Sequence, residues 1–195
     1  MKIRPTLILI MLAFLVYSVY ADETFSEGKA AYDLKDYETA FRILKPLAEQ
    51  GNALSQYYLG DMYYNGKGVL EDYTEAAKWY RLAADQGHVE AQINLGHVNY
   101  RGEGVPQDYV EAVKWYRLAA EQGDADAQFY IGRLYCYGIG VPLDYVVAHM
   151  WINLAAAQGS ETAREYRSSL SEQMTPEQIA EAQRLAREWK PKTEE

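Results

Sequence analysis

The sequence contains a single cysteine and few basic residues relative to acidic ones. Cys136 has no second cysteine with which to form an internal disulfide or a multi-cysteine zinc site. Lys and Arg number 19 against 28 Asp and Glu over 195 residues, which gives a formal net charge of -9. Nucleic-acid binding is therefore not expected, because contacts with phosphates need a basic face. The acidic balance instead favours a protein partner that offers a basic surface. An extended peptide is the other kind of partner that we expect.

The sequence also lacks the motifs that accompany enzymatic chemistry. His88, His97 and His149 show no metal-ligand spacing. There is no nucleophile elbow, no phosphate-binding loop and no dinucleotide fingerprint. We therefore predict that the protein is not an enzyme and that it binds no metal and no cofactor.

The first 21 residues have the layout of a secretory signal peptide. Lys2 and Arg4 precede an apolar run over residues 7–17, and Val19 and Ala21 occupy the small-residue positions before a cut. This run is shorter than the roughly 20 residues that a membrane-spanning helix needs. We expect cleavage after Ala21 and a periplasmic or secreted chain without stable membrane insertion. The alternative is an N-terminal anchor that is not cleaved.

A 36-residue repeat organises most of the remaining chain. Residues 52–87 and 88–123 are identical at 20 of 36 positions, and residues 88–123 and 124–159 at 17 of 36. Such periodicity is the signature of an array of stacked repeats. The predicted divisions are a signal peptide (1–21), an N-terminal partial or capping repeat (22–51), repeats 1 to 3 (52–87, 88–123, 124–159) and C-terminal capping helices (160–195).

Each copy is predicted to be a helix, a glycine loop and a second helix. In the first copy the helices are expected over 53–65 and 73–86, separated by the Gly-x-Gly at 66–68. Gly60 and its copies lie inside the first helix and suggest the close approach of a neighbouring helix. Asp72 and Glu75 are expected to form a capping box, which Asp108 and Glu111 repeat.

The two ends of the array are atypical. A helix is expected at about 24–34, without the glycine loop that follows the first helix in the other copies. Near the other end, Thr175, Pro176 and Gln178 have the pattern of a strong helix start. The following helix has one apolar and one charged face, which suits a segment that closes a stacked array.

The short motifs L-G-x-x-Y, G-x-G-V, D-Y-x-x-A-x-x-W-Y and A-A-x-Q-G resemble Sel-1-like repeats (SLR), a family related to tetratricopeptide repeats. In the first copy they stand at 59–63, 66–69, 72–80 and 83–87. The resemblance implies an all-α fold, a right-handed α-solenoid of antiparallel helix pairs with terminal capping helices. It also implies an adaptor or scaffold for protein complexes, in exported bacterial members often in envelope processes or host contact.

The family fold places the first helices on a concave surface, where we expect a protein partner to bind. Candidate residues are those that differ between copies but share one face of the first helix. We call this set the variable stripe: Leu54, Tyr58, Asp61, Asn65, Glu90, Asn94, His97, Arg101, Asp126, Tyr130, Arg133 and Tyr137. Tyr and Arg suit recognition, because they give large contacts or bidentate bonds. The alternative is that these are ordinary solvated positions.

The repeated aromatic residues are predicted to be core. Tyr73, Trp79, Tyr80 and their copies recur at the repeat period, as packing demands. Cys136 stands at a tyrosine position of the other copies and is expected to be a buried thiol. The alternative function is binding or modification of cell-wall glycan or peptide. Cysteine-rich relatives linked to such ligands carry a cysteine pair in each repeat, so no catalytic residue can be transferred to this chain.

Overall fold

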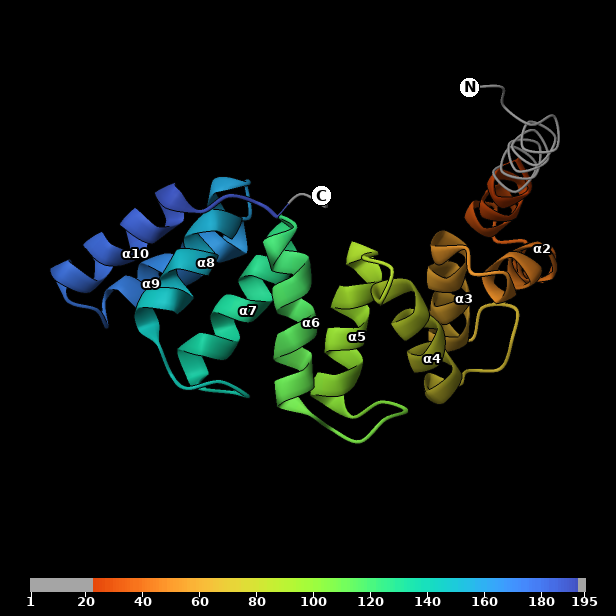
Figure 1. Cartoon of the computed structure of the whole chain (residues 1–195), viewed down its shortest axis with the longest axis horizontal. Helices are drawn as coiled ribbons and strands as arrows, with labels where there is room; N and C mark the ends of the chain where they lie inside the picture. The colour runs from red at the N-terminus through yellow and green to blue at the C-terminus, as the bar shows by residue number, and fades with distance from the viewer. Residues whose placement is uncertain (1–22, 193–195) are drawn as a thin grey trace, which may run out of the picture. The chain divides into compact units, whose positions relative to one another are not determined.

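The computed structural model describes residues 23–192, so the predicted signal peptide lies outside the described residues. The chain divides into two compact units, residues 1–83 and 84–195. We call them the N-terminal unit and the C-terminal unit (Figure 1).

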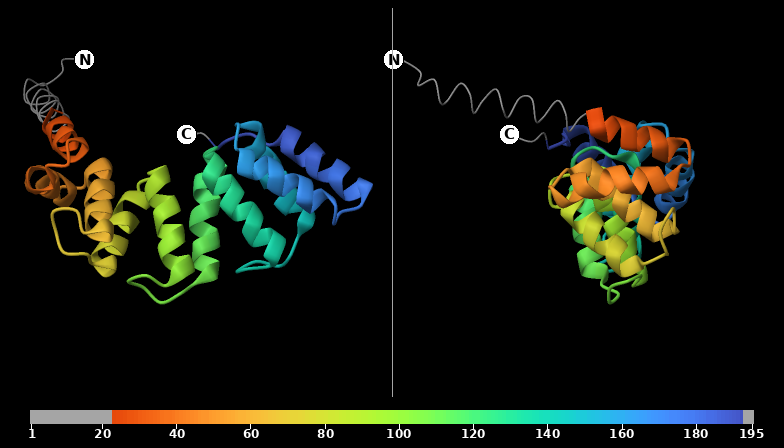
Figure 2. Two further views of the ribbon diagram at one scale, coloured as in Figure 1. Left: turned by 180° about the vertical axis from the view of Figure 1, so that it is seen from behind. Right: turned by 90° about the vertical axis from the view of Figure 1, so that its right-hand side faces the viewer.

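All regular structure in the described part of the chain is helical, which confirms the predicted all-α fold. In the N-terminal unit, α1 is helical over 23–33, followed by α2 (Tyr37–Glu49), α3 (Ala53–Asn65) and α4 (Tyr73–Ala84), which ends at the boundary of the unit. The C-terminal unit contains α5 (Val89–Arg101), α6 (Tyr109–Glu121), α7 (Ala125–Tyr137), α8 (Tyr145–Ala157), α9 (Glu161–Ser171) and α10 (Pro176–Glu188). In this unit, successive helices from α5 to α9 pack against each other, and α10 returns to α8 (Figures 1 and 2).

The first helix of each pair begins at a polar cap that the sequence analysis did not identify. The cap positions repeat with the period of the array and accept a hydrogen bond from the backbone N–H three residues later: Asn52, His88, Asp124 and Ser160. His88 does this with Nδ1, 3.2 Å from the nitrogen of Ala91. Each of these side chains satisfies one of the backbone N–H groups that a helix start leaves without a partner.

Glycines inside the first helices permit close contact with the second helices, as predicted. A Cβ at Gly60 would lie 2.7 Å from the Tyr80 ring, and one at Gly96 2.7 Å from the Tyr116 ring. The third copy has Ile152 in place of the aromatic residue and is equally tight. The Cβ of an alanine at Gly132 would lie 2.6 Å from the Cγ1 atom of Ile152. The glycine is retained because no side chain fits at the crossing of the two helices.

In two of the Gly-x-Gly loops, the second glycine packs against the start of an earlier second helix. In the C-terminal unit, Gly140 has φ +69° and a Cβ there would lie 2.4 Å from the carbonyl oxygen of Tyr109, the first residue of α6. In the N-terminal unit, Gly68 contacts the backbone of Tyr37 in the same way. The loop therefore joins consecutive repeats, and glycine is required for both its backbone conformation and its size.

Buried glutamines connect the repeats through side-chain hydrogen bonds. The Nε2 atoms of Gln56, Gln92 and Gln128 donate to carbonyls in the last turn of the preceding helix, at distances of 3.0, 3.2 and 3.3 Å. In the C-terminal unit a second glutamine extends each bond. Gln158 Nε2 donates to the Oε1 atom of Gln128 at 3.0 Å and to the Gly123 carbonyl at 2.8 Å. The polar pairs explain why glutamine is repeated at buried positions.

Two details differ from the sequence-based predictions. The capping boxes predicted at Asp72 and Asp108 form only in their first half. Asp72 accepts from the N–H groups of Thr74 and Glu75, but its own N–H donates to the carbonyl of Tyr63. Asp108 accepts from the N–H groups of Val110 and Glu111, but its own N–H donates to the carbonyl of Asn99. The Glu111 carboxylate instead accepts from Lys114 and Trp115. The second difference is Tyr109, predicted to be core but 38% exposed, although its ring centroid lies 5.2 Å from that of Tyr100 on α5.

Four of the repeated aromatic residues are buried as predicted, whereas Tyr73, Trp79 and Tyr145 are half-buried. The buried four are Tyr80, Trp115, Tyr116 and Trp151. The C-terminal cap agrees with the prediction. Thr175 caps α10 with a complete capping box, and Ala182 and Ala186 are buried on its apolar face. Trp189, directly after α10, packs edge-on against Trp151 with ring centroids 5.9 Å apart. Cys136 is a buried thiol, as expected.

Candidate functional site

The variable stripe of the N-terminal unit is largely engaged in internal contacts. Tyr58 packs against the rings of Phe25, Tyr32 and Tyr57, with centroids 6.0, 4.9 and 5.4 Å away. Leu54 is 44% exposed and Asn65 is exposed. Tyr58 therefore contributes to the packing of α1 on α3.

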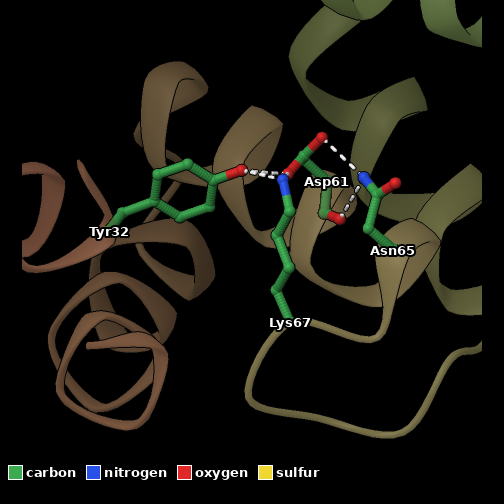
Figure 3. A network of polar contacts seen from close by, with 4 residues as sticks. All are labelled: Tyr32, Asp61, Asn65 and Lys67. Atoms are coloured by element: carbon green, nitrogen blue, oxygen red, sulfur yellow. Dashed lines mark hydrogen bonds and ion pairs between the residues drawn. The ribbon is translucent and has the colours of Figure 1, made fainter. Parts of the chain in front are cut away.

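Asp61 of the stripe lies in a polar network that joins α1, α3 and the glycine loop (Figure 3). Its carboxylate accepts hydrogen bonds from Tyr32 Oη, from Lys67 Nζ at 2.8 Å and from Asn65 Nδ2 at 2.8 Å. Lys67 Nζ also donates to Tyr32 Oη at 2.5 Å. Burial and the bond to Asp61 raise the pKa of Tyr32 to about 12, so its hydroxyl stays protonated and donates. The network neutralises Asp61 and leaves its carboxylate little capacity for a partner.

The C-terminal unit has a cavity of about 430 Å³ between α5, α6, α7 and the following glycine loop. Five residues of the variable stripe line it: His97, Arg101, Tyr130, Arg133 and Tyr137. The other lining residues, which the sequence analysis did not assign to a site, are Tyr100, Tyr116, Leu134 and Ile139. Three stripe residues of this unit lie outside the lining: Glu90, Asn94 and Asp126. We call this cavity the tyrosine–arginine pocket.

The floor of the pocket is a packed cluster of Tyr116, His97 and Tyr130. Tyr116 is 2% exposed, and its hydroxyl lies 2.7 Å from His97 Nδ1. The His97 ring packs edge-on against Tyr130 and Tyr116, with centroids 4.7 and 5.4 Å away. Burial raises the pKa of Tyr116 and lowers that of His97 below its ordinary value, so both are neutral at pH 7. We assign Tyr116 as the donor, which places the imidazole proton of His97 on Nε2.

The mouth of the pocket carries two guanidinium groups and no carboxylate among its lining residues. Arg101 and Arg133 are both exposed, and the charges of both act on the Tyr116 hydroxyl. Arg101 is 3.7 Å from Glu103, and Arg133 lies over the Phe129 ring, 5.8 Å from its centroid. The Arg101 side chain is 54% exposed and that of Glu103 28%, so water partly screens this ion pair.

The middle residue of each Gly-x-Gly loop is a signal that the sequence analysis overlooked. Lys67 bonds to Asp61, Glu103 pairs with Arg101, and Ile139 lines the tyrosine–arginine pocket. In each copy this position lies beside the variable stripe. It also varies between copies, so variation alone, without the requirement of a place on the first helix, would have selected it.

Other features of the described residues bear on the remaining predictions. Between residues 23 and 192, no three His, Cys, Asp or Glu side chains are grouped so that they could hold a metal ion. No helix in that range combines the length and apolar character that crossing a membrane requires. A second cavity of the C-terminal unit, about 510 Å³, is bordered by Lys114, Gln122 and Lys192 among others. Its lining includes no residue of the variable stripe.

Solved structures similar to this chain carry the same repeat. A Sel1 repeat protein from Oxalobacter formigenes is 40% identical, with a TM-score of 0.68 over 70% of this chain and 56% of its own. The protein c5321, a protective antigen of uropathogenic Escherichia coli strains with an SLR fold, is 34% identical. Its TM-score is 0.79 over 87% of this chain and 37% of its own. The present chain thus spans between about a third and somewhat over half of these relatives' lengths. A search of curated proteins found no match.

The family comparison covers most of the chain. The Sel1 repeat model matches four consecutive segments, residues 25–52, 53–88, 89–124 and 125–160. It therefore includes the first helix pair, in which the glycine loop is missing, as a repeat. The matches coincide with the helix pairs, the helix-crossing glycines and the glycine loops described above. The chain belongs to the Sel1 repeat family.

Proposed function

We propose that this chain is an exported, non-catalytic scaffold that binds a protein partner through the tyrosine–arginine pocket. Sel1 repeat proteins are commonly scaffolds for protein–protein interaction, and the family is generally non-catalytic. The observation that carries the proposal for this chain is the grouping of five variable-stripe residues around one cavity. Tyrosine and arginine give large contact areas and directional bonds on a helical frame that packing already holds rigid.

Binding to the pocket can be tested by affinity capture from a cell-envelope extract with residues 22–195 as bait. A pocket variant would carry Arg101→Ala, Arg133→Ala and Tyr137→Ala, all at exposed positions. Arg187→Ala is a matched control, because Arg187 is exposed on α10 and has no ion pair among the described residues. We expect that the wild type and the Arg187→Ala control capture a protein that the pocket variant does not capture. Equal capture by all three would contradict the proposal.

Export is a separate part of the proposal and rests on the sequence of residues 1–21. Expression of the full chain in a bacterium, followed by mass spectrometry of the periplasm and the medium, tests it. We expect a product that begins at Asp22 in one of these fractions. A product that retains residues 1–21 and stays in the cytoplasm would contradict export without affecting the pocket.

Glycan or wall-peptide binding is the second candidate and has weaker support. A tryptophan stacking platform needs exposed indole faces, but Trp115 and Trp151 are 2% and 7% exposed, and Trp79 and Trp189 are half-buried. Titration with cell-wall fragments while tryptophan fluorescence is recorded separates the two candidates. The scaffold proposal expects no change, whereas a saturable change would favour the glycan candidate.

A further inference from the structure

We propose that the tyrosine–arginine pocket binds an acidic segment within a partner chain, with one Asp or Glu side chain next to an aromatic or large apolar residue. This inference rests on the proposed function and specifies the partner that the pocket selects. The net charge of the protein alone would favour a basic partner. The local charge of the pocket favours the opposite, because short-range contacts and not the net charge decide what enters a site.

Charge complementarity is the first argument for an acidic segment. Arg101 and Arg133 come from two helices, α5 and α7, and line the same cavity. None of the nine lining residues is acidic. Two carboxylates interact with lining residues. Glu103 lies 3.7 Å from Arg101, and the charge of Asp126 partly opposes the lowering of the His97 pKa that burial causes. An incoming carboxylate can compete with Glu103 for Arg101, since that contact is long at 3.7 Å and the Arg101 side chain is exposed to water.

The hydrogen-bond donors of the pocket point to a carboxylate more specifically than to other acceptors. A guanidinium presents paired N–H groups that match the two oxygens of a carboxylate. Arg133 has no ion-pair partner among the described residues and is therefore available. With Nδ1 of His97 accepting from Tyr116, its Nε2–H is a further neutral donor on a residue that lines the pocket.

The apolar walls define the residue that accompanies the carboxylate. Tyr116, Tyr130 and Leu134 are buried or half-buried, whereas Tyr137 at the edge is 57% exposed. An aromatic or large apolar side chain would bury its surface against these rings and pack edge-on, as His97 and Tyr130 already do. A cavity of about 430 Å³ lies at the lower end of the range of small-ligand pockets, so it holds one or two side chains.

The N-terminal unit provides an internal contrast. The positions equivalent to Arg133 and Arg101 are Asp61 and Asn65. There the stripe carboxylate is already bound by Lys67 of the same unit. The stripe carboxylate of that unit is thus held by the chain itself. In the C-terminal unit the stripe carries arginines instead, of which Arg101 pairs with Glu103 and Arg133 lies over the Phe129 ring.

Fluorescence anisotropy with defined peptides tests the inference on residues 22–195. The probes are labelled, acetylated and amidated hexapeptides in which one Glu stands next to Phe, Tyr, Trp or Leu. A matched panel replaces Glu by Gln, and a third panel has Gln with a free terminal carboxylate. We expect the best Glu peptides to bind at least about tenfold more tightly than their Gln counterparts, because charge-assisted bonds are the stronger ones.

Variants assign the preference to the two arginines. The double variant Arg101→Gln with Arg133→Gln should bind the Glu and Gln panels equally, and Arg187→Gln should behave as wild type. Circular dichroism verifies that the double variant folds. The inference is overturned if wild type binds Glu and Gln peptides alike, binds neither, or prefers the free-terminus panel. If extract capture still depends on the pocket in that case, the scaffold function stands and only the acidic partner is wrong. Glu-peptide binding without any pocket-dependent capture would remove the scaffold function instead.

Discussion

Replacing Gly140 by alanine should destabilise the C-terminal unit more than the same change at Gly159. Both glycines have positive φ, +69° and +102°, a backbone conformation that costs a residue with a side chain about 1–2 kcal/mol. At Gly159 that strain is the whole effect, because an added Cβ would have no heavy atom within 4 Å. At Gly140 the Cβ would lie 2.4 Å from the Tyr109 carbonyl oxygen and 2.6 Å from its carbon.

The additional cost at Gly140 arises from backbone atoms, which cannot rotate away as a flexible side chain can. Tyr109 begins α6, so either the loop or the start of that helix must move. Overpacking of this kind costs about 1–3 kcal/mol. In a protein of this size, that difference corresponds to a melting temperature lower by about 2–12 °C for Gly140→Ala than for Gly159→Ala.

Thermal unfolding followed by far-UV circular dichroism measures this difference directly. Gly159→Ala is the matched control, because it shares the positive φ and lacks the contact. Equal melting temperatures for the two variants, or a more stable Gly140→Ala, would refute the role of the glycine loop as a close backbone junction between repeats.

Three further substitutions test the packing and the buried polar groups. Gly96→Ala should lower the free energy of unfolding measured in urea by about 1–2 kcal/mol, since overpacking on the Tyr116 ring exceeds the gain in helix propensity; an unchanged value would show that the ring can move. Gln128→Leu should cost about 1–3 kcal/mol in the same assay by removing the donor to the Ala120 carbonyl, and a neutral effect would contradict the glutamine connection. Burial, assisted by Arg167, lowers the pKa of His149 in the folded state. The unfolded chain therefore binds more protons than the folded chain below about pH 6.5, and the free energy of unfolding decreases as the pH is lowered. The decrease in melting temperature from about pH 7.5 to about pH 5.5 should therefore be smaller for His149→Gln than for wild type. An equal decrease would exclude this histidine as a source of the pH dependence.

The repeat made most of the fold predictable from the sequence. Gly60 and its copies were expected at helix crossings because glycine inside a helix is costly unless space demands it, and the contacts with Tyr80 and Tyr116 confirm this. The capping box at Asp108 was not predicted correctly. Its N–H donates to the Asn99 carbonyl, a tertiary contact that local sequence spacing does not show.

The candidate site was predictable in outline but not in composition. Variation between copies selected His97, Arg101 and Arg133, which the structure brings to one cavity. The same criterion could not show that Asp61 is neutralised by Lys67, because that contact depends on a loop residue between two invariant glycines. Tyr116 was assigned to the core, where it is, yet it also forms the floor of the pocket.

Site-specific photocrosslinking in intact cells tests most directly that the tyrosine–arginine pocket binds a protein partner. A photoreactive amino acid would replace Tyr137 at the edge of the pocket or, as the control, Arg187 on α10, both of which are exposed. The account predicts a discrete crosslinked partner for the probe at position 137 that is absent for the probe at position 187. Crosslinking patterns that do not differ between the two positions would contradict it.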